Sequence, residues 1–358
     1  MEKSIQRMIF HIPMRINRER ASASSIRPVK MIEAFERLGY EVILIEGNAS
    51  QRKKRIKEIK HNIRKGVTYD FLYSESSTMP TLLTEKNHLP LYPFLDFSFF
   101  AFCKKHGIKI GLFYRDIYWV FKKKRSFKEW VAYIFYKYDI LKYNKFLDVL
   151  FLPSKEMNAY IPNIKVESVI PLPSGLQLHS SPKIEHPLLE LLFVGAIGGL
   201  YDITLLVKVI SGIQGIHLTI CCRENEWQKE KINYLPFLNE NITIVHKSGV
   251  EVEELYRKAD ISCIFFKTDK YLDFAVPYKL YESISYKCPV LANIDTLTGK
   301  YVQNNDIGII SSWNETQLTD VLNSITKEDL NKYQFQLNHL VYNNKWKVRC
   351  QLVEELLG

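Results

Sequence analysis

Residues 277–292 read PYKLYESISYKCPVLA, and this stretch decides the fold. Its leading proline can open a helix, because the N–H that proline lacks is not needed in the first turn. Lys279 and Glu282 then stand three residues apart on one face of that helix. The apolar runs at 259–266 and 289–292 read as short buried strands on either side. Strand, helix and strand in this order form a βαβ unit, whose loop and helix N-terminus open at the sheet edge where nucleotides bind.

The first half of the chain repeats this alternation of strand and helix. An apolar run at 8–12 predicts a strand, and a helix is expected at 26–38 with Ser25 as its N-cap. A second strand follows at 41–46. Further strands are predicted at 71–74, 109–114, 149–152 and 168–170, with a helix near 93–105. The first half is therefore expected to be an α/β domain with a doubly wound sheet.

A linker divides the chain, and the pattern then restarts. Residues 171–187 are dense in Pro, Ser, His and Gly and show no sustained periodicity. Strands are predicted at 189–194, 217–222 and 241–246, and helices at 201–210 and 252–258. We therefore expect an α/β fold of two doubly wound, Rossmann-like domains, at 1–176 and 177–335.

The composition is that of a folded protein. The chain has 358 residues, of which 46% are hydrophobic and 13% aromatic, enough to bury the cores of two domains. It contains no run of eighteen apolar residues, and its N-terminus lacks the apolar segment of a signal peptide, so we expect a cytoplasmic protein. Six cysteines show no paired metal spacing, which predicts buried, reduced thiols and no metal.

Positive charge is concentrated in the first half. Residues 1–176 hold 31 Lys and Arg against 17 Asp and Glu, whereas residues 177–358 hold 18 against 22. The first half therefore needs an acidic partner; nucleic acid, anionic lipid headgroups and a phosphorylated acceptor all satisfy this charge. Its basic clusters are Arg52-Lys53-Lys54-Arg55 and Lys122-Lys123-Lys124-Arg125.

The second basic cluster leads into an aromatic helix. Ser126 and Glu129 have the spacing of a capping box, so a helix is expected over 127–146. Its aromatic residues are spread too widely for one narrow core stripe, and beside the basic cluster they favour an anionic membrane surface as partner. The alternative is a core helix with tyrosine hydroxyls at its rim. Because no nucleic-acid-binding module occurs, no nucleic acid partner is expected.

The run 250–292 resembles the nucleotide-sugar site of GT-B glycosyltransferases, the group that includes family 4 enzymes of bacterial surface polysaccharide synthesis. In that group a Pro-x-Lys-x-x-Glu helix places its Glu on the ribose hydroxyls of the donor and its Lys near the diphosphate. The resemblance implies that Glu282 is the ribose ligand and Lys279 a diphosphate contact. The plainer alternative is an ordinary surface ion pair. Five other residues of this run join the candidate donor site: Asp273, Ala275, Val276, Pro277 and Leu280.

The match departs from the commoner family pattern at one position. That pattern carries a second Glu eight residues before the ribose Glu, and here this position is Phe274. The nearest carboxylate is Asp273, one residue earlier. The resemblance also implies that the two domains face a nucleotide across a cleft. By the same resemblance, a closing helical segment, at 336–358, is expected to cross back onto the first domain.

A glycine-rich loop follows the strand predicted at 189–194. Gly195, Gly198 and Gly199 let the backbone approach a phosphate closely and present N–H groups to it. A tight packing turn explains Gly195 equally well. Arg223, which follows the strand at 217–222, is a second candidate cation for the diphosphate, with a solvated loop arginine as the alternative.

The first domain offers acceptor-site candidates at the edge of its sheet. The strand at 110–114 delivers Arg115 and Asp116 to its carboxyl end. Asp116 either orients an acceptor hydroxyl and acts as a general base, or pairs with Arg115, or caps the next turn. His11 ends the first strand and reads more readily as a core histidine than as a base. Arg18, Ser24 and Ser25 are candidates for an anion site that would suit a lipid-linked pyrophosphate. The alternative is a surface loop with a serine cap.

Together these features predict a glycosyltransferase that moves a sugar from a nucleotide donor, expected to be a UDP-sugar, onto a lipid-linked or growing glycan. The expected setting is bacterial capsule, exopolysaccharide or O-antigen synthesis at the inner face of the plasma membrane. Asp116 and Lys279 are the candidate catalytic residues. The family implies a retaining reaction, and the absence of an Asp-x-Asp pair predicts that no metal or other cofactor is needed. The rival hypotheses are a catalytically silent GT-B subunit and a nucleotide-sugar epimerase.

Overall fold

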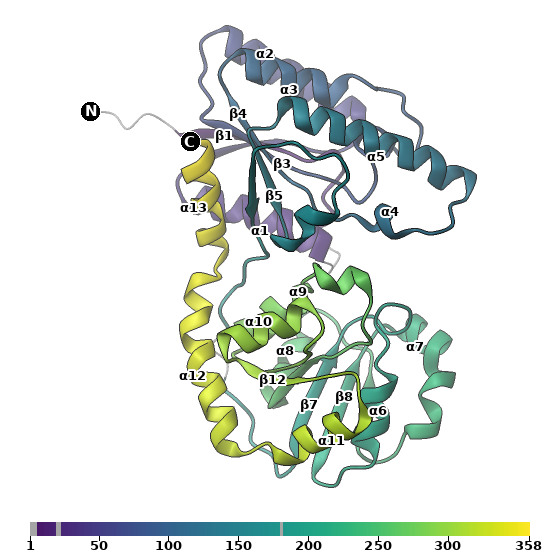
Figure 1. Ribbon diagram of the computed structural model, residues 1–358. Helices are drawn as coiled ribbons and strands as arrows, with labels where there is room; N and C mark the ends of the chain where they lie inside the picture. The colour runs from purple at the N-terminus through teal and green to yellow at the C-terminus, as the bar shows by residue number, and fades with distance from the viewer. Residues whose placement is uncertain (1–5, 19–22, 180–181) are drawn as a thin grey trace. The chain divides into compact units, whose positions relative to one another are not determined.

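The computed structural model describes residues 6–18, 23–179 and 182–358 (Figure 1). Contacts within the chain divide it into two units. Unit 1 holds the chain up to Gly175 together with Trp346–Gly358, and unit 2 holds Leu176–Lys345. The sequence placed the first division one residue later and the start of the closing segment at 336. Residues 336–345 therefore belong to unit 2 rather than to the returning segment.

Unit 1 is built on a parallel six-stranded sheet with the order β2-β1-β3-β4-β5-β6. Its strands are rich in Ile, Leu and Phe and are largely buried, as parallel strands between two helix layers must be. In Figure 1, α2, α3 and α5 cover one face, and α1 and α13 cover the other. The strands are β1 (Arg7–His11), β2 (Glu41–Ile45), β3 (Phe71–Glu75), β4 (Lys109–Phe113), β5 (Val149–Leu152) and β6 (Ser168–Pro171). The helices are α1 (Ala23–Arg37), α2 (Ala49–Arg64), α3 (Leu95–Lys105), α4 (Tyr118–Phe121), α5 (Phe127–Phe146) and α13 (Trp346–Leu357).

The predicted elements of the first half are confirmed, with three differences. Helix α2 was not expected, because its sequence was read as a basic cluster rather than as a helix. The short helix α4 was not expected either. Helix α1 begins at Ala23, so Ser25 lies within its first turn and is not the N-cap.

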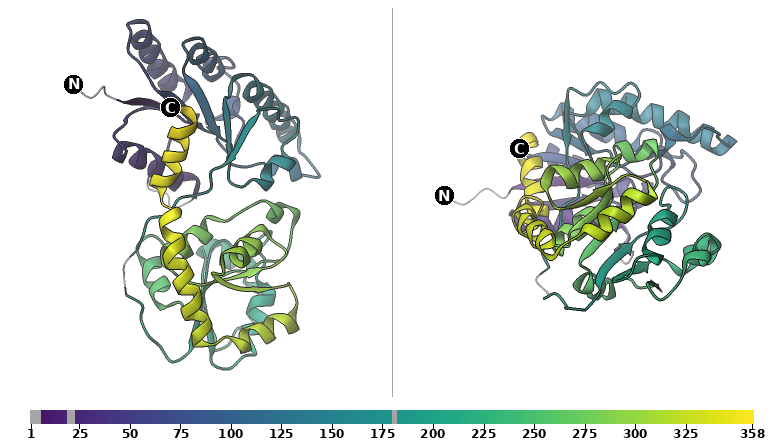
Figure 2. Two further views of the ribbon diagram at one scale, coloured as in Figure 1. Left: turned by 60° about the vertical axis from the view of Figure 1, so that its left-hand side comes forward. Right: turned by 60° about the horizontal axis from the view of Figure 1, so that its bottom comes forward.

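Helix α13 completes unit 1 although it lies at the far end of the sequence (Figure 2). It packs along α1, and its Trp346 closes on Gly175, where an added Cβ would stand 2.5 Å from the indole ring. Gly111 on β4 makes room for Leu357 in the same way, because an added Cβ would stand 2.6 Å from the Leu357 side chain. The preceding helix, α12 (Lys327–Asn343), instead packs on α9 of unit 2, which explains why the returning segment starts at Trp346.

Unit 2 is a second parallel six-stranded sheet, with the order β12-β11-β10-β7-β8-β9. The βαβ unit predicted around 277–292 is confirmed, because α9 connects the parallel neighbours β10 and β11. The strands are β7 (Leu189–Val194), β8 (Ile216–Cys221), β9 (Ile242–Val245), β10 (Ile261–Ile264), β11 (Val290–Asn293) and β12 (Gly308–Ser311). The remaining helices are α6 (Thr204–Ser211), α7 (Glu224–Glu230), α8 (Glu251–Lys258), α9 (Tyr278–Ser285), α10 (Leu297–Asn305) and α11 (Glu315–Ser324).

Each sheet has a point where the direction of winding reverses. In unit 1 the chain winds outward from β1 to β2 on one side and from β3 to β6 on the other. In unit 2 it winds from β7 to β9 on one side and from β10 to β12 on the other. Ligands of doubly wound folds bind at the carboxyl ends of the strands at such a point. The topology thus directs attention to the ends of β1 and β3, and of β7 and β10.

Candidate functional site

The glycine-rich loop leaves the carboxyl end of β7, at the switch point of unit 2. Gly198 has φ of 87°, and an added Cβ there would meet the Glu230 carboxyl carbon at 2.5 Å, so this position requires glycine. Gly199 also has a positive φ, of 57°. Gly195 has ordinary backbone geometry, and its N–H is used in a bond to the Cys221 carbonyl oxygen (3.0 Å).

The amide groups of this loop differ in what they can offer a ligand. Gly198 and Tyr201 exchange two backbone hydrogen bonds, of 3.1 and 3.0 Å, which close a tight turn. Within the described residues, the N–H groups of Ala196, Ile197 and Gly199 form no hydrogen bond. Unused N–H groups beside a switch point are the feature by which backbone loops hold phosphate.

Helix α9 brings Lys279 and Glu282 together at the same edge of the sheet. Pro277 is the residue just before the helix, and its extended ψ of 143° sets the helix start. The Lys279 ammonium bonds Glu282 Oε2, and both side chains are partly exposed. Glu282 Oε1 has no partner among the described residues. One carboxylate oxygen is therefore held and the other is available.

A tyrosine from α8 braces the same carboxylate. The Tyr256 hydroxyl donates to Glu282 Oε2 at 3.5 Å, and the Tyr256 ring stacks on Tyr286 with centroids 4.5 Å apart. His179 stacks on the other side of Tyr286 at 4.1 Å. Burial, followed by the nearby Glu282 charge, raises the pKa of Tyr256 well above its ordinary value. The hydroxyl therefore remains a donor to Glu282 at any physiological pH.

The other predicted donor residues differ in how far they are buried. Phe274, at the position of the family's first Glu, is buried and packs edge-on against Tyr271, whereas Asp273 is exposed. Leu280 is fully buried in the core and its N–H bonds Pro277, so the structure does not bring its side chain to the sheet edge. Arg223 is mostly exposed at the start of α7 and pairs with Glu226. Ala275 and Val276 lie half-buried in the loop before α9.

The corresponding edge of unit 1 holds a buried ion cluster. Glu75, at the end of β3, has no exposed surface and accepts from Arg27 (3.2 Å) and Arg115 (3.0 Å). The Tyr73 hydroxyl donates to Glu75 as well, at 3.1 Å. The Arg27 guanidinium lies over the Phe113 ring, 3.5 Å from its centroid. Arg115 is therefore anchored beneath the edge by Glu75 and by the Ser76 carbonyl oxygen rather than extended into solvent.

Asp116 caps the turn that leads into α4. Its Oδ1 accepts from the backbone N–H groups of Ile117 (2.6 Å) and Tyr118 (3.1 Å), and the side chain is half-buried. The capping role anticipated as one alternative is thus present, and it orients the carboxylate at the carboxyl end of β4.

His11 belongs to a buried network at the end of β1. Its two ring nitrogens bond Ser74 Oγ (2.8 Å) and Asp96 Oδ1 (2.9 Å). Arg52 forms a two-pronged ion pair with the same Asp96, at 2.9 and 3.0 Å. Burial alone raises the pKa of Asp96, but the bonds from His11 and Arg52 outweigh it and lower the pKa to about 2. The structure supports the core-histidine interpretation of His11.

This network corrects the interpretation of the first basic cluster. Arg52 was counted among surface cations, but it is buried on the inner face of α2. The spacing of Arg52, Ile56 and Ile59 at i, i+4 and i+7 is the sequence signal that would have placed it on a core-facing stripe.

The remaining acceptor candidates are only partly described. Arg18 is mostly exposed and pairs with Glu46 at 3.2 Å. Ser25 lies in the first turn of α1 and is partly buried. The side chain of Ser24 lies outside the described part of the structure. Two residues that the sequence analysis missed, Glu75 and Tyr256, anchor the charged groups of the two sheet edges.

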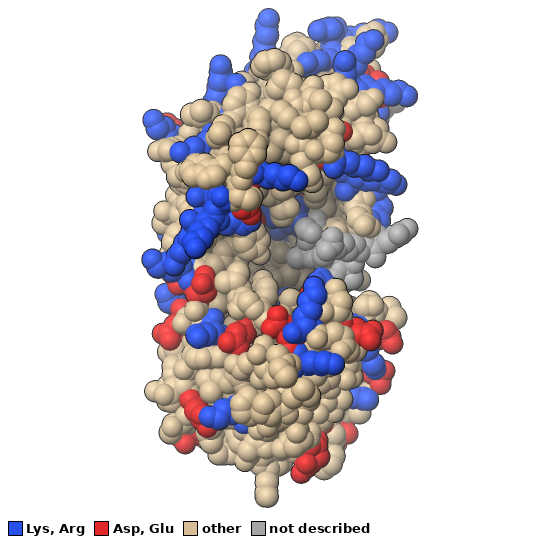
Figure 3. Space-filling model, turned by 90° about the vertical axis from the view of Figure 1, so that its right-hand side faces the viewer, with Lys and Arg blue, Asp and Glu red and all other residues tan. Residues whose placement is uncertain are grey.

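A surface of unit 1 combines apolar and basic side chains. Four large apolar residues share one face of α5 and are exposed: Phe127 (84%), Trp130 (52%), Ile134 (61%) and Leu141 (65%). Lys137 and Lys145 are exposed on the same helix, and Lys122, Lys123 and Lys124 are exposed just before it. On the face shown in Figure 3, Lys and Arg predominate over unit 1, whereas acidic and basic side chains are mixed over unit 2.

The described residues contain neither a cluster of metal ligands nor a helix that could span a membrane. In 6–18, 23–179 and 182–358, no three or more His, Cys, Asp or Glu side chains are arranged to hold a metal ion. Over the same ranges, no helix has both the length and the apolar character needed to cross a bilayer. All six cysteines are buried and unpaired.

Solved structures with a similar fold cover 98% of the chain. Anabaena HepE, in a complex with UDP, aligns with a TM-score of 0.68 and 9% identity over 98% of this chain and 99% of that chain. A glycosyltransferase from Rickettsia africae ESF-5 aligns with a TM-score of 0.66 and 15% identity, over 98% of both chains. WaaG, a glycosyltransferase involved in lipopolysaccharide biosynthesis, aligns with a TM-score of 0.61 and 13% identity, over 98% of this chain and 99% of that chain.

Comparison with family models and with curated proteins is less informative. No protein-family model matches the chain, and no curated protein matches it. The identities to the solved structures are low, so the likeness rests on the arrangement of the two six-stranded sheets and their helices. The chain has the GT-B fold.

Proposed function

We propose that this protein is a glycosyltransferase that uses a nucleotide-sugar donor, and that unit 2 holds the nucleotide. The observation that carries the proposal is the carboxylate of Glu282, which is braced on Oε2 by Lys279 and Tyr256 while Oε1 stays available at the switch-point edge. A braced carboxylate can accept hydrogen bonds from the two neighbouring hydroxyls of a ribose. UDP is the nucleotide bound to HepE, and a UDP-sugar is accordingly the proposed donor class.

The donor diphosphate has two sources of stabilisation nearby. Lys279 has three N–H donors, so it can keep its bond to Glu282 and still donate to a phosphate oxygen. The unused amides of Ala196, Ile197 and Gly199 add backbone donors. As the bond to the sugar breaks, negative charge grows on the departing diphosphate, and fixed donors aimed at it lower the barrier. We propose on this basis a metal-independent, retaining reaction, with Lys279 as a catalytic residue.

The acceptor is proposed to bind at the carboxyl edge of the unit 1 sheet. Asp116 is the candidate that orients the attacking hydroxyl, since its Oδ1 is fixed by two backbone N–H groups. Glu75 holds two guanidinium groups just below this edge. Guanidinium groups pair well with phosphate oxygens, and on this basis we propose an acceptor with the chemistry of a lipid-linked glycan diphosphate.

A lipid-linked acceptor requires access to a membrane, and the α5 surface suits one. We propose that Phe127, Trp130, Ile134 and Leu141 enter the interfacial layer while the neighbouring lysines contact anionic headgroups. We propose accordingly that the protein lies peripherally on the inner face of a bacterial plasma membrane. Capsule, exopolysaccharide or O-antigen synthesis is the proposed setting.

Calorimetric titration with UDP, GDP, dTDP and CMP tests the donor assignment. We expect UDP to bind with micromolar affinity and Glu282→Ala to weaken it about tenfold or more, a loss of roughly 1.4 kcal/mol. Glu328→Ala, at an exposed position on α12, is the matched control and should leave binding unchanged. If none of the four nucleotides binds, the donor assignment fails. The replacement of the family's first Glu by buried Phe274 would then favour a silent subunit.

Flotation with vesicles tests the membrane assignment. We expect binding to vesicles that contain phosphatidylglycerol but not to neutral phosphatidylcholine vesicles, and loss of binding in Ile134→Asp/Leu141→Asp. Phe335→Asp, at a comparably exposed position on α12, is the control. Unchanged flotation of the α5 variant would exclude this surface as the contact.

A further inference from the structure

An aromatic stack in unit 2 ends on the carboxylate of Glu282. The His179 ring stacks on Tyr286 with centroids 4.1 Å apart and planes inclined by 22°. Tyr286 stacks in turn on Tyr256, at 4.5 Å and 9°. The Tyr256 hydroxyl then donates to Glu282 at 3.5 Å. The stack therefore connects a residue of the linker, His179, to the carboxylate that is proposed to bind the ribose.

The end of α9 places Tyr286 on the same side of the helix as Glu282. Tyr286 is the residue that follows the helix, and its backbone N–H donates to the Glu282 carbonyl oxygen at 3.2 Å. Residues four apart lie one turn apart on one face. The middle ring of the stack and the carboxylate are therefore presented to α8 together, and Tyr256 of α8 contacts both.

The packing around Tyr256 restricts where its hydroxyl can lie. Tyr256 is buried in a cluster of unit 2 that also contains Leu192, Val252 and Cys288. Tyr286 packs against this cluster and covers one face of the Tyr256 ring. A tyrosine side chain turns about only two bonds, so the contacts of its ring decide the position of its hydroxyl. Loss of the Tyr286 ring should therefore loosen the bond from Tyr256 to the carboxylate.

His179 contacts both helices that form the stack. Its backbone N–H donates to the Ser285 carbonyl oxygen on α9 at 3.3 Å, and its Nδ1 lies 3.7 Å from Glu253 Oε2 on α8. Burial lowers the pKa of His179 below its ordinary value, although the Glu253 and Glu282 charges act to raise it, so the ring is neutral at neutral pH. Its contact with Tyr286 is then the attraction between two stacked rings.

We propose that His179 and Tyr286 are positioning residues of the donor site, which act on the ribose through Tyr256 and Glu282. A carboxylate that is already held in one orientation loses little side-chain freedom when it accepts two ribose hydroxyls. A carboxylate that can rotate must be ordered as the nucleotide binds, and the affinity falls accordingly. The stack thus strengthens the contribution of the ribose hydroxyls and leaves that of the diphosphate unchanged. This inference rests on the proposed function, because it takes Glu282 as the ribose ligand.

The test is calorimetric titration of the full chain with UDP and, separately, with dideoxy-UDP, which lacks both ribose hydroxyls but keeps the base and the diphosphate. We expect Tyr286→Leu and His179→Gln each to weaken UDP binding about threefold to tenfold, the range that an aromatic pair contributes. The same variants should bind dideoxy-UDP as the unaltered protein does, because that ligand makes no use of Glu282. In the Glu282→Ala protein, Tyr286→Leu should cause no further loss of UDP affinity.

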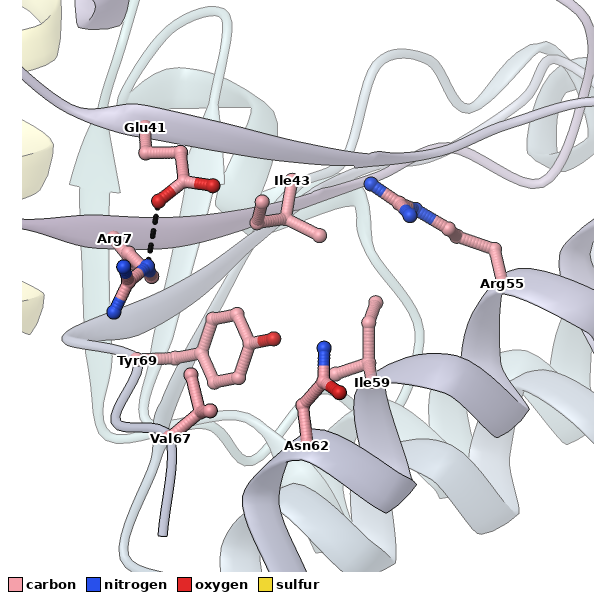
Figure 4. A pocket seen from close by; sticks show the side chains of 8 residues that line it. All are labelled: Arg7, Glu41, Ile43, Arg55, Ile59, Asn62, Val67 and Tyr69. Atoms are coloured by element: carbon pink, nitrogen blue, oxygen red, sulfur yellow. Dashed lines mark hydrogen bonds and ion pairs between the residues drawn. The ribbon is translucent and has the colours of Figure 1, made fainter. Parts of the chain in front are cut away.

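Conservative variants separate the stacked rings from their polar atoms. Tyr286→Phe and His179→Phe keep a ring at each position and should hold the UDP affinity within about twofold of that of the unaltered protein. Tyr69→Leu is the matched control for loss of packing, because it removes a largely buried tyrosine ring that lines a pocket in unit 1 (Figure 4). It should leave UDP binding unchanged. Thermal unfolding checks that every variant is folded.

Several results would overturn the positioning role. Equal losses of UDP and dideoxy-UDP affinity in Tyr286→Leu would mean that the ring supports only the fold of unit 2. A loss in Tyr286→Phe as large as that in Tyr286→Leu would assign the effect to the hydroxyl rather than to stacking. If Glu282→Ala weakens UDP binding and neither Tyr286→Leu nor His179→Gln does, the stack has no role although the donor site stands. If UDP does not bind the unaltered protein, the donor site is refuted and this inference with it.

Discussion

Replacing Asp139 with Asn is expected to stabilise the protein above neutral pH. Asp139 lies on the buried face of α5, where its Oδ2 accepts from the Thr81 backbone N–H at 2.8 Å and its Oδ1 has no partner in the part of the chain that the structure describes. Burial raises the pKa of Asp139 to about 7, against hydrogen bonds from Thr81 that lower it and a smaller contribution from Asp96 that raises it. Asn keeps the acceptor for Thr81 and cannot ionise.

The magnitude follows from the linkage between protonation and folding. Below about pH 4 Asp139 is protonated in both the folded and the unfolded chain. Between about pH 4 and 7 only the folded chain keeps the proton, so the free energy of unfolding falls by about 1.4 kcal/mol per pH unit. Above pH 7 the full loss, about 4 kcal/mol, has accumulated. Between pH 5 and 8 the advantage of Asp139→Asn over the unaltered protein should therefore grow by about 3 kcal/mol.

Urea unfolding at pH 5, 6, 7 and 8 measures this difference. Trp119 is a local fluorescent reporter, because it stacks on Tyr136, one turn of α5 before Asp139. Asp320→Asn, at an exposed position on α11, controls for the loss of one carboxylate. If the stability difference between Asp139→Asn and the unaltered protein stays constant from pH 5 to 8, Asp139 does not hold its proton in the folded chain, and the reasoning is refuted.

Four further substitutions test other contacts. Asp96→Asn should lower the free energy of unfolding by about 3–5 kcal/mol, because buried Arg52 loses the carboxylate that accepts two of its N–H groups. Acid titration of the unaltered protein should show this contribution disappearing between about pH 4 and 2, since the pKa of Asp96 is depressed. Gly198→Ala should abolish calorimetric UDP binding by distorting the loop, whereas Gly195→Ala should leave it within twofold. Tyr256→Phe should weaken UDP binding about three- to tenfold with unchanged thermal stability, and an unchanged affinity would contradict its bracing role.

The sequence predicted most of the fold, because parallel strands and amphipathic helices leave local signals. The βαβ unit around α9 and the pairing of Lys279 with Glu282 follow from spacing alone. The contact of Tyr256 with Glu282 could not be predicted from spacing, since the two residues are 26 positions apart in the sequence. Glu75 was missed because the strand was predicted to stop one residue before it.

Charge composition alone does not identify the exposed basic residues. A count of basic residues does not show which way each side chain points, so Arg52 was grouped with exposed neighbours although it faces the core. The residue at which the returning segment starts could not be predicted from the sequence either. It depends on the fit of Trp346 against Gly175, which are far apart in the sequence.

The division of the chain also bears on the order of folding during synthesis. Unit 2 is continuous in sequence, whereas the core of unit 1 includes Cys350, Val353 and Leu357 of α13. A ribosome releases the strands of unit 1 first, yet their helix layer stays open until α13 emerges. Unit 2 is synthesised after the strands of unit 1, yet it can complete its core before unit 1 does. Between the release of the unit 1 strands and the emergence of α13, apolar surface of unit 1 is therefore exposed to chaperones. A fragment that ends at Gly175 should aggregate.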